Sequence, residues 1–235
     1  MDILNYYKNK NLLSNGNSNT KMAKNKMETY GLSLIPHSLN SKGENLCKFS
    51  TKECRALCLN SSGRAGMTKI QEARKLKTDF FLEHTKEFID KLWKELESLD
   101  KKGNCAVRLN VVSDVDWEMI FNKYQKSLNQ LQNITFYDYS KDYFKIQANV
   151  LKNYHFTYSY SGHNWKICET FLKDKIANVT VVFKPHIPPE YMGFEVINGD
   201  ETDERFLDKK GVIVGLKYKV PRGVLYEKNK FVIEI

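Results

Sequence analysis

The sequence predicts an α/β fold, a partial (β/α) barrel with a mainly parallel sheet and a short β-rich C-terminal extension. The first observation is an alternation of strand-like runs with amphipathic helical patterns between residues 28 and 184. This order is typical of parallel strands joined by right-handed helical crossovers. The second observation is a change after Pro185, where helical patterns stop and short β runs alternate with turn-forming residues.

The individual elements follow from local pattern. Five runs rich in β-branched and aromatic residues are expected to be strands: 29–37, 105–112, 134–140, 154–161 and 178–184. Apolar residues recur every three or four positions in the segments expected to be helical: 67–99, 117–131, a helix starting at 142, and 163–175. The first helical segment is either one helix or two that join near Thr78 and Asp79. Ser113 and Asp114 are candidate caps for the second.

Length and composition define the domain organisation. With 235 residues and 41% hydrophobic content, the chain can bury one substantial core, so we expect a single barrel-like domain over residues 28–235. Residues 1–27 are rich in Asn and Lys and lack periodicity, which predicts a flexible arm. The sequence contains no apolar run that would span a bilayer and no secretory signal. We therefore expect a cytoplasmic protein with no membrane partner.

The formal net charge of +9 favours a polyanionic partner, a nucleotide or nucleic acid. Lysines spread over helical faces are also typical of an ordinary solvated surface. Charge alone leaves both interpretations open.

Three of the five cysteines, Cys47, Cys54 and Cys58, lie in one loop with the spacing C-x6-C-x3-C. Three thiolates from one loop can ligate a [4Fe-4S] cluster and leave one iron open. A zinc site requires a fourth ligand, for which His37 or Cys105 is available. Plain buried thiols are the third interpretation. An odd cysteine count in a reducing compartment argues against a disulfide framework.

Polar residues gather where the predicted strands end. Ligands of α/β barrels bind at the carboxyl ends of the strands, so these residues are candidates for the functional site. We expect catalytic groups at Asp114, Asp138 and Lys141, and cofactor-binding or substrate-binding groups at Arg64, Asn110, Ser113 and Ser159. Helix caps also favour Ser and Asp at such positions.

Seven segments, in the same order, resemble a phage- and plasmid-encoded family called gene product 88. They are CLNSSGRAG, EARKLKTDFF, VRLNVVSDVDWE, FYDYSK, YHFTYS, VINGDETDERFLD and GVIVGLKYK. The resemblance runs from about residue 28 to the carboxyl terminus. It implies a mobile element or virus in a host cell and no particular activity.

The layout of a strand, a three-cysteine loop and a helix at the start of a partial barrel is similar to radical S-adenosylmethionine enzymes. The resemblance implies that Cys47, Cys54 and Cys58 ligate a [4Fe-4S] cluster whose open iron binds S-adenosylmethionine. The sequence departs from that family's C-x3-C-x2-C loop, and it lacks the Gly-Gly-Glu expected after the second strand. These departures affect cofactor cleavage more than cluster binding.

The leading hypothesis is an iron-sulfur protein, radical S-adenosylmethionine-like, that acts on a nucleotide or nucleic acid. The second is a nucleic-acid-binding protein in which the cysteines hold structural zinc. The third is a metal-free barrel enzyme that modifies a nucleobase, with Asp114 or Asp138 as acid, base or nucleophile.

Overall fold

A computed structural model describes residues 2–18, 21–221, 223 and 225–235. The helices are α1 (Ile3–Tyr7), α2 (Lys52–Ala56), α3 (Thr68–Glu83), α4 (Thr85–Lys102), α5 (Trp117–Lys123), α6 (Tyr143–Ala148) and α7 (Trp165–Lys173). The strands are β1 (Ser14–Asn15), β2 (Glu28–Gly31), β3 (Cys105–Arg108), β4 (Ile134–Ser140), β5 (Tyr154–Ser159), β6 (Asn178–Lys184), β7 (Glu190–Tyr191), β8 (Phe194–Asn198), β9 (Ile213–Lys217) and β10 (Val232–Glu234). Short 3-10 turns are η1 (Gly16–Ser18), η2 (Met22–Lys24), η3 (Leu59–Ser61), η4 (Gly63–Gly66), η5 (Leu128–Gln130) and η6 (Arg205–Leu207).

The strands of the described residues form one sheet in the order β1-β2-β3-β4-β5-β6-β9-β8-β7. Neighbouring strands from β2 to β8 along this order are parallel, and the edge strands β1 and β7 pair antiparallel with their neighbours. The mainly parallel α/β sheet is therefore confirmed. The sheet is not closed, because β1 and β7 stand at its two ends, so a barrel is not confirmed.

The C-terminal extension is β-rich, as predicted. β8 and β9 widen the sheet beyond β6, and β10 pairs parallel with residues 182–184 of β6. β5 pairs with residues 178–180 of the same strand. β10 thus takes the place of β5 along the second half of β6, so the last strand lies beside the carboxyl end of β5.

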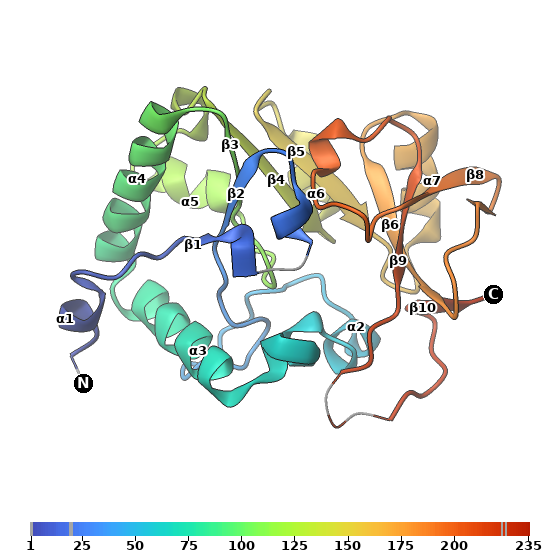
Figure 1. Cartoon of the computed structure of the whole chain (residues 1–235), viewed down its shortest axis with the longest axis horizontal. Coiled ribbons are helices and arrows are strands. Elements are labelled where there is room, and N and C mark those ends of the chain that lie inside the picture. Colours follow the sequence, from blue (N-terminus) through green and yellow to red (C-terminus); the bar gives the residue numbers. More distant parts are fainter. Residues whose placement is uncertain (1, 19–20, 222, 224) are drawn as a thin grey trace.

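The core falls into two clusters that follow the predicted helical periodicity. Helices α3 and α4 lie together on one side of the molecule, and α7 lies near the other end of the sheet (Figure 1). α4 buries Phe88, Leu92 and Leu96 on one face, and these pack in the first cluster with Trp117 and Phe136. The second cluster joins one face of α7 to β5, β6 and β9. Burial of these apolar faces is the main stabilising contribution to the fold.

The long helical segment is two helices, but their junction lies at His84 and not near Thr78 and Asp79. Thr78 is buried inside α3, where its hydroxyl donates to the Arg74 carbonyl and accepts from the Ile35 amide (both 2.8 Å). Because the Thr78 hydroxyl has both partners, it ties the helix to the chain after β2 instead of interrupting the helix.

The N-terminal segment is packed and is not the flexible arm predicted from composition. Leu12 and Leu13 are buried, and β1 pairs with β2. The Glu95 carboxylate accepts from the Leu12 amide (2.8 Å) and the Leu13 amide (2.9 Å). The composition of the segment does not predict this packing, because the groups that hold the segment, such as Glu95, lie elsewhere in the chain. Part of the predicted arm, Met1 and residues 19–20, lies outside the described residues.

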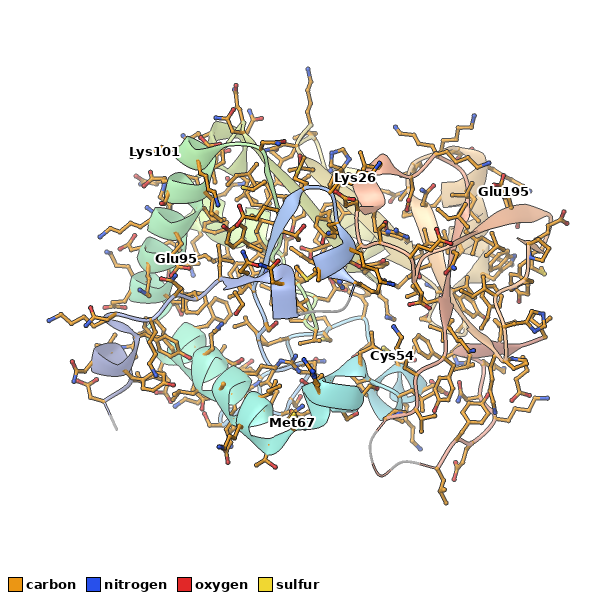
Figure 2. All side chains as sticks on the ribbon, viewed as in Figure 1. Lys26, Cys54, Met67, Glu95, Lys101 and Glu195 are labelled. Atoms are coloured by element: carbon orange, nitrogen blue, oxygen red, sulfur yellow. The ribbon has the colours of Figure 1, made fainter. Side chains whose placement is uncertain are left out.

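A second anchor holds the end of the same segment. The Glu204 carboxylate accepts from the backbone amides of Lys26 (3.0 Å) and Met27 (2.9 Å). Figure 2 shows Lys26 beside the η6 turn, which begins next to Glu204. The acidic segment around residue 203 therefore secures the N-terminal segment against the sheet.

Candidate functional site

A cleft of about 1150 Å³ opens where the central parallel strands end. Its walls include Gly31 from β2, Arg108 from β3, Ser140 from β4 and Ser159 from β5. This is the edge at which parallel strands of an α/β sheet present a ligand site. Nine of the ten predicted site residues line the cleft: Cys47, Cys54, Cys58, Arg64, Asn110, Ser113, Asp114, Lys141 and Ser159.

The cysteine loop is held by local caps and by the β3 loop. Thr51 caps the short helix α2, and its hydroxyl accepts from the Cys54 amide (3.2 Å). The Asp114 amide donates to the Leu46 carbonyl (2.9 Å), so the residue before Cys47 is tied to the loop after β3. All three cysteines are partly buried and free of disulfides. Cys54 is a residue of α2 and lies near the middle of the molecule (Figure 2).

Lys141 lies among the three thiols. It follows β4 directly, and its ammonium group interacts electrostatically with Cys54 and Cys47. Burial alone would lower the pKa of Lys141, but the charges of Cys54, Asp114 and Cys47 outweigh burial and raise it. The lysine therefore remains a cation at neutral pH beside the thiols.

Burial favours the protonated form of two of the thiols, Cys47 and Cys58. Burial raises the pKa of Cys47 to about 12, and burial also raises the pKa of Cys58. The Lys141 charge acts in the opposite direction on both groups without outweighing burial. When these thiols lose their protons, the Lys141 cation and a metal centre bound to the sulfurs would stabilise the resulting thiolates.

Asp114 bridges the loops that follow β3 and β4. Its carboxylate accepts from the Ser140 hydroxyl (2.7 Å), the Lys141 amide (2.9 Å) and the Lys145 ammonium (2.6 Å). Neither Asp114 nor Ser113 caps the following helix α5, because Asp116 does so by accepting from the Met119 amide (3.0 Å). The predicted caps are therefore wrong by two or three residues, and Asp114 instead positions Lys141.

Asp138 does not reach the cleft. It is 0% exposed, and its carboxylate accepts from Asn110 and from the Tyr154 hydroxyl (2.6 Å). Burial raises the pKa of Asp138 to about 6. The carboxylate holds Asn110, whose side-chain carbonyl accepts from the Ser113 hydroxyl (3.0 Å) and the Val115 amide (2.8 Å). The structure thus places Asp138 behind the loop that forms the cleft wall.

Arg64 and Ser159 lie on different parts of the cleft wall. Arg64 is exposed in the η4 turn and makes no ion pair or side-chain hydrogen bond within the described parts of the chain. Ser159 is buried at the end of β5, where its carbonyl accepts from the Asn164 side chain (3.1 Å). Arg64 is therefore available to a ligand, whereas Ser159 shapes the floor.

A second polar centre of the cleft, around Asp203, was not predicted from the sequence. The Asp203 carboxylate pairs with Arg108 (3.0 Å) and Lys21 (3.3 Å) and accepts from the Tyr137 hydroxyl (3.0 Å). Burial alone would raise the pKa of Asp203, but Arg108 and Lys21 outweigh it and lower the pKa. The Arg108 guanidinium also stacks on the Tyr139 ring (4.7 Å). The available signal was Arg108 itself, a lone cation in an apolar strand.

The arrangement of the His, Cys, Asp and Glu side chains limits which metal the protein can hold. Within residues 2–18, 21–221, 223 and 225–235, no group of three or more His, Cys, Asp or Glu side chains is arranged to hold a metal ion. Cys105 is buried in β3, with its sulfur 3.8 Å from the Leu99 carbonyl, so it does not join the cleft cysteines. His37 lines the cleft. This conformation supports neither an iron-sulfur centre nor a radical S-adenosylmethionine architecture by itself.

No helix in the described part of the chain is both long and apolar enough to cross a membrane.

Comparison with curated proteins gave no match, and comparison with solved structures gave none either. The family model described as gene product 88 matches residues 10–230, a description that fits a phage-type protein. The match covers almost the whole sheet, the cysteine loop and all the residues that line the cleft except Tyr6, Tyr7 and Phe231. The chain therefore belongs to the gene product 88 family.

Proposed function

We propose that this protein is an iron-sulfur protein in which Cys47, Cys54 and Cys58 hold a [4Fe-4S] cluster facing a cleft for a nucleotide or nucleic acid. The observation that carries the proposal is the position of Lys141, a partly buried cation that lines the cleft with all three cysteines and interacts electrostatically with each of them. Buried cations require anionic partners. Three thiolates on an iron-sulfur core supply a net negative charge at this position.

A cluster and a zinc ion differ in the sulfur spacing that they require. A zinc ion requires its sulfur ligands within about 2.3 Å of one point. In a cubane each thiolate binds a different iron, so the sulfurs can stand further apart. The described thiols share one cleft wall but do not form a single-ion site. A cluster bound there would supply electron transfer or an open iron, and Lys141 would balance its charge.

The chain also supports a finer proposal, in which the open iron binds S-adenosylmethionine. Five parallel strands, β2 to β6, are adjacent in chain order, and the cysteine loop follows the first of them. A partial barrel of the radical S-adenosylmethionine type has this order. Asp114 would then position Lys141, and Asn110 and Ser113 would contact the substrate. Asp138 would act through Asn110 and not as a catalytic group.

The test is anaerobic purification followed by iron, sulfide and zinc analysis and a visible absorption spectrum. We expect about four irons and four sulfides per chain. Cys54→Ser should lose the cluster, whereas Cys168→Ser should retain it, because Cys168 is buried in the second core cluster away from the cleft. Stoichiometric zinc without iron would overturn the proposal in favour of a zinc site.

Reconstitution with iron and sulfide under anaerobic conditions covers the case in which the cluster is lost during purification. A protein that takes up neither iron nor zinc after this treatment would also overturn the proposal. Addition of S-adenosylmethionine to the loaded protein then tests the finer proposal. A changed electron paramagnetic resonance spectrum of the reduced cluster supports it, and an unchanged spectrum contradicts it.

A further inference from the structure

The cleft concentrates the positive charge of the protein. Its walls contain eleven Lys and Arg residues but three Asp residues, whereas the chain as a whole has 37 basic and 28 acidic residues. Basic side chains spread evenly over the surface would not produce this imbalance. A concave surface of one sign focuses the electrostatic field and attracts ligands of the opposite sign.

The three carboxylates of the cleft are already paired. Asp114 binds Lys145 (2.6 Å), and Asp203 binds Arg108 (3.0 Å). Asp200 binds Lys219 (3.0 Å). Because each of these carboxylates already has a cationic partner, none of them neutralises the remaining Lys and Arg side chains. The cleft therefore keeps a net positive charge where it opens to solvent.

Three of the remaining cations, Arg64, Lys69 and Lys217, are exposed. None of them forms an ion pair or side-chain hydrogen bond with a residue that the structure describes. Arg64 and Lys69 flank the start of α3, and Lys217 ends β9. An isolated bridge between Ser62 and Pro221 brings these two segments together, so the cations border one part of the cleft.

An aromatic side chain lies between the cations of the β9 segment. Tyr218 lines the cleft between Lys217 and Lys219, and its ring lies 5.0 Å from that of Tyr226. Its hydroxyl has no hydrogen-bond partner among the described residues. Phe231 lines the same cleft, beneath the Lys141 ammonium (5.5 Å). Cations for phosphates and aromatic rings for bases are together typical of surfaces that bind single-stranded nucleic acid.

We infer that the cleft binds a single-stranded segment of nucleic acid, with phosphates on Arg64, Lys69 and Lys217 and a base stacked on Tyr218. A duplex keeps its base faces inside the helix and offers none to Tyr218. The cleft volume of about 1150 Å³ exceeds the roughly 300–1000 Å³ of pockets that hold one drug-sized ligand. More than one nucleotide therefore fits. The inference deepens the proposed function by naming its substrate class, but strand binding does not require the cluster.

The test is fluorescence anisotropy of the full-length protein with labelled single-stranded DNA, single-stranded RNA and the matching duplexes. We expect at least one single strand to bind more tightly than its duplex. Its affinity should fall with salt, with a slope of about −0.7 for each phosphate neutralised. Equal or tighter binding of both duplexes would overturn the inference.

A matched pair of variants locates the site. Lys69 and Lys166 are both exposed and both the second residue of a helix, but Lys69 lines the cleft and Lys166 does not. Lys69→Ala should weaken strand binding several-fold and lower the salt slope by about 0.7, whereas Lys166→Ala should change neither. Equal effects of the two substitutions would contradict the assignment of the cleft.

Tyr218→Leu tests the stacking contact, because leucine keeps an apolar contact with Tyr226 but removes the aromatic face. We expect about tenfold weaker binding with an unchanged salt slope. Circular dichroism confirms that each variant is folded. Unchanged affinity of a folded Tyr218→Leu variant would overturn the stacking contact.

Two further measurements separate this inference from other outcomes. If adenosine monophosphate displaces the labelled strand as effectively as unlabelled strand does, the site is one for single nucleotides and the inference is wrong. Replacement of Cys47, Cys54 and Cys58 by Ser should abolish iron binding and leave strand binding measurable. Failure of the cluster and failure of strand binding are thus read from different signals.

Discussion

Asp138 and Asn110 are joined by two hydrogen bonds, from the Asn110 backbone amide (2.8 Å) and from its side-chain amide (3.0 Å) to the two carboxylate oxygens. This pairing links β4 to the loop after β3. Asn110 in turn accepts from Ser113, which lines the cleft. A buried carboxylate thus fixes the shape of the cleft wall without contacting the cleft.

The Asp138 pairing predicts an unusual pH dependence of stability. Burial raises the pKa of Asp138 to about 6, against about 3.9 in an unfolded chain. Between these values the folded state holds a proton that the unfolded state has released, so stability falls as pH rises through this window. The shift corresponds to about 3 kcal/mol.

Urea unfolding of the wild type and Asp138→Asn between about pH 4 and 7 measures this effect. The wild-type free energy of unfolding, relative to the variant, should decrease as pH rises toward 6 and stay level above it. Asp174→Asn, at an exposed position after α7, serves as the control. Parallel curves for wild type and Asp138→Asn would show that Asp138 has no raised pKa.

Lys141 is expected to control the reactivity of the neighbouring thiols. Its charge lowers the pKa of Cys47 and Cys58 against the larger opposing effect of burial. Lys141→Met should therefore raise both thiol pKa values further and slow alkylation by iodoacetamide at mildly alkaline pH, because the thiolate is the reactive form. Mass spectrometry of the cysteine peptides measures the rates. Lys141→Arg should restore them, and faster alkylation in Lys141→Met would contradict the prediction.

Glu95 and Glu204 are expected to secure two different parts of the N-terminal segment. Glu95→Ala should lower amide exchange protection at Leu12 and Leu13, and Glu204→Ala at Lys26 and Met27. Each loss should amount to about 1–3 kcal/mol, the cost of leaving buried donors unpaired. Each variant is the control for the other in one hydrogen-exchange experiment. Equal loss at both sites in either variant would mean that the segment opens as one unit.

The buried Asp203 is expected to contribute more to stability than Asp200, which lines the same cleft. Asp203→Asn leaves Arg108 buried without its carboxylate, which costs about 3–5 kcal/mol. Asp200→Asn removes a half-exposed pair with Lys219 and should cost about 1 kcal/mol or less. Urea unfolding at neutral pH measures both. Equal costs would contradict the assignment.

The pH dependence of Asp203 has the opposite sign to that of Asp138. Because the folded-state pKa of Asp203 is lowered, its contribution is present above the unfolded pKa and is lost as pH falls through the folded pKa. The stability difference between wild type and Asp203→Asn should therefore shrink in acid. A difference that stays constant in acid would show that the Arg108 pairing does not lower the pKa.

Local pattern located the five predicted strands and the cysteine loop, although β2 and β3 end at Gly31 and Arg108, earlier than predicted. The predicted strands 134–140 and 178–184 have the same bounds as β4 and β6. Alternation of strands and helices predicts a parallel sheet, and the carboxyl ends of parallel strands meet at one edge. This physical rule brought nine of ten candidate residues into one cleft.

Local pattern could not assign the face of each residue within a strand. Tyr139 lines the cleft, whereas its neighbour Asp138 points into the core, because successive side chains of a strand point to opposite faces. Both faces of β4 are largely buried and both contain polar groups, so the sequence contains no polar alternation that distinguishes them. The sequence therefore placed Asp138 in the site along with Lys141.

The sequence by itself determined the alternation of strands and helices, the helical faces and the clustering of three thiols in one loop, since these depend on local periodicity and on chain connectivity. Only the tertiary structure decided which charges meet. Lys141 reaches the thiols, Arg108 meets Asp203 across 95 residues of chain, and Glu95 orders Leu12. Such pairs form when distant segments pack, and their energy depends on burial and distance in space, which no local pattern records.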